Sequence, residues 1–205
     1  MRSLRNGTWV TGDTMEFYLY TLIKDYEVLH PGEKKFISIP SKLVEHAMIH
    51  GNNGMAHPDK CWRKFGMDKL FDYQTILIPV NTGGHWVLFI VNIEESKLTL
   101  RCHDSLRRPE DDPIVSTVAS RKVVTEFLRT HWETYREGDL PDVTTNDDHS
   151  NDPCQTNDYD CGVFVMHYAR CLVRGEATNP QGVENRVTML RNWLLTTIHK
   201  YGLHD

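Results

Sequence analysis

Apolar side chains recur every three to four residues in several stretches of the chain, which predicts amphipathic helices. The first helix spans about Asp13 to Tyr26, and a shorter one begins at Ser41 as N-cap and ends near His50. Residues 52–58 then predict a loop. The same period returns in Arg121–Arg136, and a last helix begins at Asn179-Pro180.

The middle of the chain predicts β-structure. Thr75–Val80 is a short apolar run, and it ends at a turn formed by residues 81–84, two of which are glycines. His85–Ile93 is almost wholly apolar, as expected of a central strand that is buried on both faces. Lys97–His103 alternates between polar and apolar positions. We therefore expect an antiparallel meander of at least three strands.

Two later segments complete the fold prediction. Gly162–Val173 is apolar all round, which indicates a helix buried in the core, and Gly175 ends it. Residues 138–154 predict a long acidic loop. The order of helices and strands indicates an α+β fold. Because no linker or repeat divides the chain, we expect one domain over residues 1–205.

Composition and charge narrow the possible functions. The chain is 40% hydrophobic and 25% charged, which is ordinary for a globular protein. No apolar run reaches the ~20 residues that a membrane span needs. The net charge of -5 argues against a nucleic-acid partner, which a basic surface would bind.

Cysteine usage indicates the compartment. The 5 cysteines are dispersed rather than arranged as a disulfide framework, and the N-terminus has no secretory signal. We expect a reduced, intracellular protein of the nucleus or cytoplasm.

One cysteine stands at the predicted start of the buried helix. Cys161 follows Asp160 and precedes Gly162. A helix N-terminus carries about half a positive charge, which stabilises a thiolate, and the glycine leaves the backbone beside the sulfur open to a substrate carbonyl. Taken alone, a cysteine in such a helix is more often a small buried hydrophobic residue.

Two further residues give this cysteine candidate partners. His85 stands where the glycine turn enters the central strand, and Asp104 stands at the far end of the strand that pairs with it. The hairpin returns the chain to the level of His85, so the carboxylate could fix the tautomer of the imidazole. Gln155 could donate its amide to an oxyanion together with the Cys161 backbone N–H. Each residue alone has a structural explanation, as a turn residue or a surface glutamine.

Several separated segments of the chain match, in order, the pattern of one known family. They are Trp9 with Phe17-Tyr18, Ile76–Pro79, Gly83–Ile93, Cys102–Leu106 and Gln155–Ala169. Their pattern resembles the ubiquitin-like-protein-specific proteases, the Ulp or sentrin-specific group of cysteine peptidases. The resemblance implies a papain-like α+β fold of the Ulp type, with a mixed central sheet flanked by helices.

The resemblance also implies roles for six residues. Cys161 would be the nucleophile, His85 the general base and acid, Asp104 its orienting partner and Gln155 the oxyanion donor. Trp9 and Trp86 would sandwich the Gly-Gly tail of a ubiquitin-like modifier, since only glycine lacks the Cβ that would clash between two indoles. The implied partner is SUMO, NEDD8 or ubiquitin, and we expect a monomer without metal or cofactor.

Alternatives remain open on the sequence. His46, His50, His57 and Cys61 are spaced like the ligands of a zinc site, although no Cys-x-x-Cys pair accompanies them and a solvated helix face followed by a loop is the commoner explanation. Cys154 could form a regulatory disulfide. An effector acetyltransferase or a viral or transposon-type precursor protease would use the same cysteine, histidine and acid. A module that only binds modifiers, without cleaving them, would not need these catalytic residues.

Overall fold

The computed structural model describes residues 7–54, 66–106, 115–146, 152–178 and 187–200, and a five-stranded mixed sheet forms the centre of the fold. The strands are β1 (Phe36–Ser38), β2 (Thr75–Asn81), β3 (Trp86–Ile93), β4 (Lys97–His103) and β5 (Asp142–Asn146), and they lie side by side in that order. β2, β3 and β4 pair antiparallel, whereas the two outer strands pair parallel to their neighbours.

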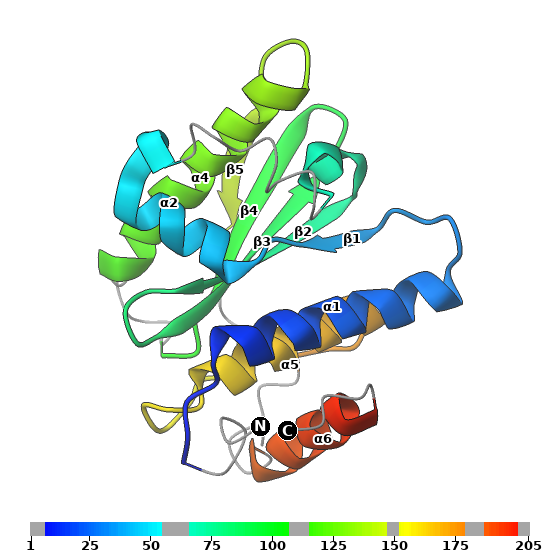
Figure 1. The fold of residues 1–205 in the computed structure, drawn as a ribbon, viewed down its shortest axis with the longest axis vertical. Helices are drawn as coiled ribbons and strands as arrows, with labels where there is room; N and C mark the ends of the chain where they lie inside the picture. Colours follow the sequence, from blue (N-terminus) through cyan, green and yellow to red (C-terminus); the bar gives the residue numbers. More distant parts are fainter. Residues whose placement is uncertain (1–6, 55–65, 107–114, 147–151, 179–186, 201–205) are drawn as a thin grey trace.

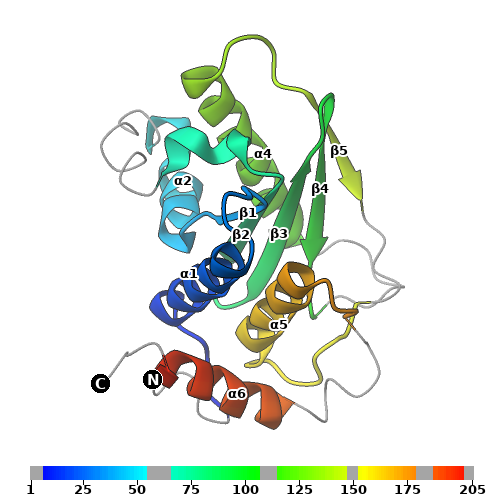
Figure 2. The same ribbon diagram turned by 90° about the vertical axis from the view of Figure 1, so that its right-hand side faces the viewer.

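Helices cover both faces of this sheet (Figures 1 and 2). One face packs against α1 (Gly12–Leu29) and α5 (Cys161–Arg174), through a core that includes Leu19, Leu88 and Phe164, and α6 (Val187–Lys200) adds to this core from beyond the two helices. The other face packs against α2 (Ser41–Gly54), the short 3-10 helix η2 (Met67–Asp72) and α4 (Val115–Tyr135). Successive residues of β3 alternate between the two cores, so every residue from 86 to 91 is buried.

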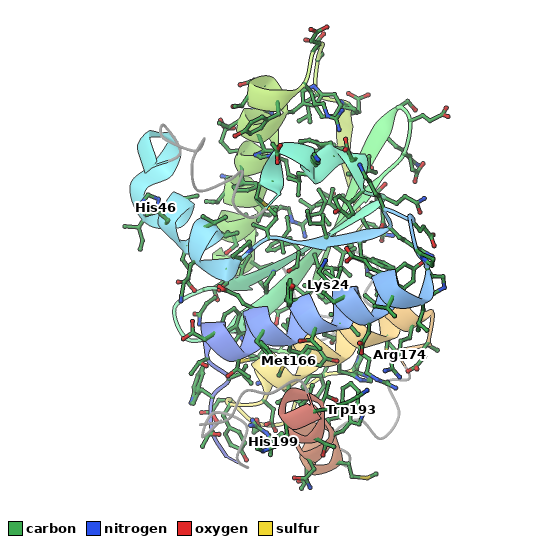
Figure 3. All side chains as sticks on the ribbon, turned by 45° about the vertical axis from the view of Figure 1, so that its right-hand side comes forward. Lys24, His46, Met166, Arg174, Trp193 and His199 are labelled. Atoms are coloured by element: carbon green, nitrogen blue, oxygen red, sulfur yellow. The ribbon has the colours of Figure 1, made fainter. Side chains whose placement is uncertain are left out.

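The helix α6 lies below α5, on the side away from the sheet. Its Trp193 contacts the edge of the Tyr18 ring, with 6.0 Å between the ring centroids, and the Arg170 guanidinium lies 4.9 Å above the indole (Figure 3). Figure 3 also shows Arg174 beside this contact. A guanidinium is attracted to the face of an indole by its charge and packs flat against it. These contacts therefore stabilise the packing of α6 against α5.

The structure confirms the predicted meander, the α+β order and the buried helix that ends at Gly175, whose φ of 65° suits glycine. It also corrects two boundaries and adds two strands. Residues 138–154 are not one loop, because β5 lies within them; α4 begins at Val115 rather than Arg121. Residues 52–54 continue α2, and β1 was not predicted. Residues 55–58 and the predicted start of the last helix, residues 179–186, lie outside the described part of the chain.

The two strands were missed for different reasons: β5 is polar, whereas β1 contains the buried Phe36 and Ile37 but is too short to show a period. β5 is an edge strand in which only Val143 is partly buried, and β1 has 3 residues. Their position comes from backbone pairing with β4 and β2, which local side-chain patterns do not encode. Within the described ranges, none of the helices is long and apolar enough to cross a membrane.

Candidate active site

A tight turn places His85 at the mouth of β3. The Asn81 side-chain oxygen accepts the Gly83 and Gly84 N–H groups at 3.0 and 2.9 Å, and the two glycines have φ of +86° and +118°. L-residues with a side chain rarely adopt these angles, so the glycines permit this turn. The Thr82 N–H closes it by donating to the His85 carbonyl at 2.8 Å.

Asp104 reaches His85 from the end of the neighbouring strand. In the β3–β4 register Leu88 pairs with His103, so the residue after His103 lies near the start of β3. The His85 Nε2 to Asp104 Oδ1 distance is 2.7 Å. The carboxylate is buried and also accepts the Leu106 N–H at 3.0 Å and the Thr117 hydroxyl at 3.1 Å. The pairing that the hairpin predicted is therefore present.

Cys161 is the first residue of α5, and its thiol lies close enough to His85 to contribute to the raised pKa of the imidazole. The residue is 1% exposed, in the core beneath the sheet. The preceding Asp160 is the N-cap residue, yet its side chain makes no capping hydrogen bond to the helix. The Val163 N–H donates to the Asp160 carbonyl at 2.8 Å, whereas the N–H groups of Cys161 and Gly162 precede the first acceptor of the helix and stay available beside the sulfur.

Electrostatics favour a charged His85. Burial by itself would lower the pKa of His85, but the hydrogen bonds with Asp104 and Cys161 outweigh it and raise this pKa to about 9. Burial would likewise raise the pKa of Asp104, and the hydrogen bond from His85 lowers it below its usual value instead. At neutral pH the pair is thus an imidazolium and a carboxylate.

Gln155 lies in the segment that leads to Cys161, and both ends of its side-chain amide are held. Its Oε1 accepts the Ser105 hydroxyl at 2.6 Å, and its Nε2 donates to the Asn157 carbonyl at 2.5 Å. Its backbone N–H donates to the Ser105 carbonyl at 2.7 Å. Because Ser105 follows Asp104, these bonds tie the glutamine to the end of β4. One N–H of the amide remains for another acceptor.

The two tryptophans lie in different surroundings. Trp9 is 47% exposed, and a Cβ built on Gly84 would lie 3.8 Å from its ring, so the indole rests over the turn that precedes His85. Trp86 is 2% exposed, and its indole N–H donates to the Val10 carbonyl at 2.9 Å. Val10 therefore connects the two tryptophans. A tail-binding tunnel between them stays a prediction.

Sequence reasoning missed one residue of this region, Arg191 of α6. Its guanidinium bonds the Asp160 carboxylate from Nε at 2.9 Å, and it also bonds the Thr8 carbonyl at 2.8 Å. The sequence did indicate that Arg191 is unusual. It stands at helical spacing between Val187 and Leu194, and the structure buries both of these hydrophobic residues. A charged residue on the apolar face of a helix needs a buried partner.

Most of the alternative metal site falls outside the described residues. His46 is exposed on α2, while the His50 side chain, His57 and Cys61 lie outside the described part of the chain. Among the residues that are described, no group of three potential ligands could hold a metal ion. Cys102, Cys154, Cys161 and Cys171 form no disulfide with one another.

Comparison with known proteins agrees with this geometry. The chain is 28% identical over 183 residues to Ubiquitin-like-specific protease 1A of Arabidopsis thaliana, covering 85% of this chain and 34% of that protein. The chain thus spans about a third of the length of the curated relatives it matches.

Solved structures share the fold. One is titled "Crystal structure of the de-sumoylating protease" (TM-score 0.72, 17% identity, 98% of this chain and 85% of the other). Another is the C-terminal Ulp1 protease domain in complex with Smt3, the yeast ortholog of SUMO (TM-score 0.65, 16% identity, 96% of this chain and 81% of the other).

The model of one protein family matches nearly the whole chain. Its description is "Ulp1 protease family, C-terminal catalytic domain", and it matches residues 10–202. That range contains His85, Asp104, Gln155 and Cys161. The chain therefore belongs to the Ulp1 protease family of cysteine peptidases.

Proposed function

We propose that the protein cleaves the bond after the C-terminal Gly-Gly of a ubiquitin-like modifier, with SUMO the first candidate. The observation that carries the proposal is one chain of contacts. Asp104 bonds Nε2 of the His85 ring at 2.7 Å, and His85 in turn lies beside Cys161 at the N-terminus of α5. Nucleophile, base and orienting acid in this arrangement perform acyl transfer.

The first half of the reaction forms a thioester. A protonated His85 stabilises the Cys161 thiolate, which attacks the carbonyl carbon of the last glycine. The carbonyl oxygen becomes an oxyanion and accepts hydrogen bonds from the Cys161 backbone N–H and the remaining Gln155 amide N–H. When the intermediate collapses, His85 gives its proton to the leaving amine, and the peptide or isopeptide C–N bond breaks.

The second half releases the modifier. His85, now neutral, takes a proton from water as the water oxygen attacks the thioester carbonyl. The C–S bond breaks, the modifier leaves with a free carboxylate, and Cys161 returns to the thiolate paired with the imidazolium. Asp104 stays ionised throughout, because its pKa lies below the usual range, and it keeps the ring in one orientation.

The preference for glycine would come from steric exclusion. Trp9 covers the Gly83-Gly84 turn next to His85, so a tail that reaches Cys161 passes beneath an indole. A side chain on the tail would clash with the indole on either side, whereas glycine has no side chain to clash. This argument requires Trp86 to form the second wall, and its burial in the core gives that wall rigidity.

The names of the relatives support a ubiquitin-like modifier as substrate, and the Smt3 complex of a structural neighbour supports SUMO in particular. NEDD8 and ubiquitin are the other candidates. The reaction serves maturation of a precursor and deconjugation equally, since both break a bond after the same glycine. All the proposed reacting residues come from one chain, so catalysis needs no residue from a second copy. The monomeric state and a reducing compartment, the nucleus or cytoplasm, belong to the same proposal.

Electrophilic Gly-Gly probes made from SUMO, NEDD8 and ubiquitin test the proposal directly. We expect one of them, SUMO first, to form a covalent adduct that mass spectrometry places on Cys161. The Cys161→Ser variant is the control and should remain unlabelled. An adduct on Cys102, Cys154 or Cys171, or no adduct with any probe, would refute the proposal. A parallel incubation with acetyl-CoA tests the acetyltransferase alternative.

A further inference from the structure

The buried arginine of α6 connects two parts of the candidate site that are far apart in the sequence. Arg191 is 1% exposed, and its partners are the Asp160 carboxylate, the Thr8 carbonyl and the Tyr159 carbonyl. Thr8 directly precedes Trp9, and Asp160 directly precedes Cys161. One guanidinium therefore contacts the residue before the exposed tryptophan and the residue before the nucleophile.

The contact with Asp160 has a consequence for the N-terminus of α5. An aspartate at an N-cap position normally turns its carboxylate onto the first N–H groups of the helix. Here the carboxylate instead accepts from Arg191 at 2.9 Å and from the Asn157 amide at 2.7 Å, and it makes no capping bond. The arginine thus keeps a negative group away from the backbone N–H groups next to Cys161.

The contact with Thr8 holds the extended segment before α1. Residues 8–11 run from the start of α1 toward α6 without belonging to a helix or strand (Figures 1 and 2). The Thr8 carbonyl is bonded by Arg191 at 2.8 Å and the Val10 carbonyl by the Trp86 indole at 2.9 Å. Trp9 lies between these two anchored carbonyls. Its place over the Gly84 turn depends on both.

We propose that Arg191 is a positioning residue for the reaction. It holds the Asp160 carboxylate off the N-terminus of α5, and by bonding the Thr8 carbonyl it anchors the segment that carries Trp9 to α6. This inference rests on the proposed function. A lysine cannot replace the arginine, because a guanidinium presents several N–H groups in a fixed fork, whereas an ammonium is a single point of charge. Replacing it should release Thr8, Asp160 or both.

The test compares Arg191→Lys with a matched control, Arg170→Lys. Arg170 also joins α5 to α6, through the Trp193 indole, and it pairs with Glu176 just after the end of α5 at 2.6 Å, but it contacts neither Thr8 nor Asp160. We measure kcat and KM on a modifier with a fluorogenic C-terminal amide, the melting temperature, and amide hydrogen exchange of residues 7–11. For Arg191→Lys we expect kcat/KM to fall roughly 10- to 100-fold, because small misplacements of reacting groups are that costly.

Hydrogen exchange of residues 7–11 should become faster in Arg191→Lys and stay unchanged in Arg170→Lys, whose kcat/KM should remain within about twofold of wild type. A folded Arg191→Lys with kcat/KM within twofold of wild type, or with unaltered exchange, would overturn the inference. Should the lysine variant not fold, Asp160→Asn combined with Arg191→Met removes both buried charges. We expect that double variant to fold with low activity, and wild-type activity in it would overturn the inference as well.

The two proposals fail separately. A wild-type protein that leaves SUMO, NEDD8 and ubiquitin substrates all uncut would refute the proposed function. The exchange comparison between Arg191→Lys and Arg170→Lys needs no substrate, so it tests the anchoring of the Trp9 segment in either case.

Discussion

Replacing Gly162 with alanine should reduce activity far more than stability. A Cβ on Gly162 would lie 2.6 Å from the Val10 Cβ and 2.9 Å from its Cγ2, where ordinary contacts begin near 3.4 Å. The difference, 3.4 minus 2.6, requires a shift of about 0.8 Å. Both close atoms belong to a branched side chain next to its own backbone, so the Trp9 segment must move with them.

The two effects have different magnitudes. Overpacking costs about 1–3 kcal/mol, and alanine gains up to about 1 kcal/mol over glycine in a helix, so stability should fall by about 0–3 kcal/mol. A displacement near 1 Å at the site can cost about 100-fold in rate. We therefore expect a large loss of kcat/KM with a small change in melting temperature, measured on the modifier-fluorophore substrate.

Two further variants make this prediction decisive. In Gly12→Ala the added Cβ lies 3.4 Å from the Ser41 hydroxyl oxygen, an ordinary contact, so this control should keep its activity. Combining Gly162→Ala with Val10→Gly removes the colliding atoms and should restore part of kcat/KM. Wild-type activity in Gly162→Ala, or no recovery in the double variant, would refute the reasoning.

Three other predictions follow from the same geometry. Asp104→Asn should keep the fold but leave His85 in the wrong tautomer, lowering turnover on the order of 10³–10⁴-fold in a steady-state assay; a twofold change would contradict this. The pKa of His85 rises from 6.5 to about 9 on folding, so protonation of His85 stabilises the folded state. This stabilisation is fully present below pH 6.5 and is lost as the pH rises through 9. Melting curves of wild type and His85→Gln across that range should converge at high pH, and parallel curves would contradict it. Trp9→Ala should narrow the kcat/KM gap between Gly-Gly and Ala-Gly tails, whereas Tyr20→Ala, which removes another exposed aromatic residue, should leave the gap unchanged.

The parts of the fold that the sequence predicted are those in which side-chain burial follows a period. β3 is buried on both faces and α5 is buried all round, so their patterns are unambiguous. β5 is an exposed edge strand, and its backbone bonds to β4 leave no hydrophobic signal. The His85–Asp104 contact was predictable because two strands of an antiparallel hairpin face each other residue by residue. Counting back from the turn between them therefore shows which residues lie side by side.

The contacts of Arg191 could not be predicted in the same way. Thr8 and Arg191 are separated by 183 positions in the chain, and their contact depends on how α6 packs beneath α5. The pattern of α6 predicts only that Arg191 faces the core, not which group it meets there. Such a partner is settled by tertiary packing, which the spacing of residues along one helix does not contain.

The anchoring of the candidate site is therefore uneven. His85 and Asp104 stand on paired strands, and Cys161 stands on a helix packed under the sheet, so their positions share the stability of the core. Residues 8–11 have no regular secondary structure: Thr11 caps α1 and Val10 is buried in the core, and the remaining contacts join them to Arg191, Gly162 and Trp86. Loosening these last contacts displaces the indole over the turn. Substitutions at these three positions should therefore alter KM and tail selectivity in ways that substitutions at other α5–α6 contacts do not.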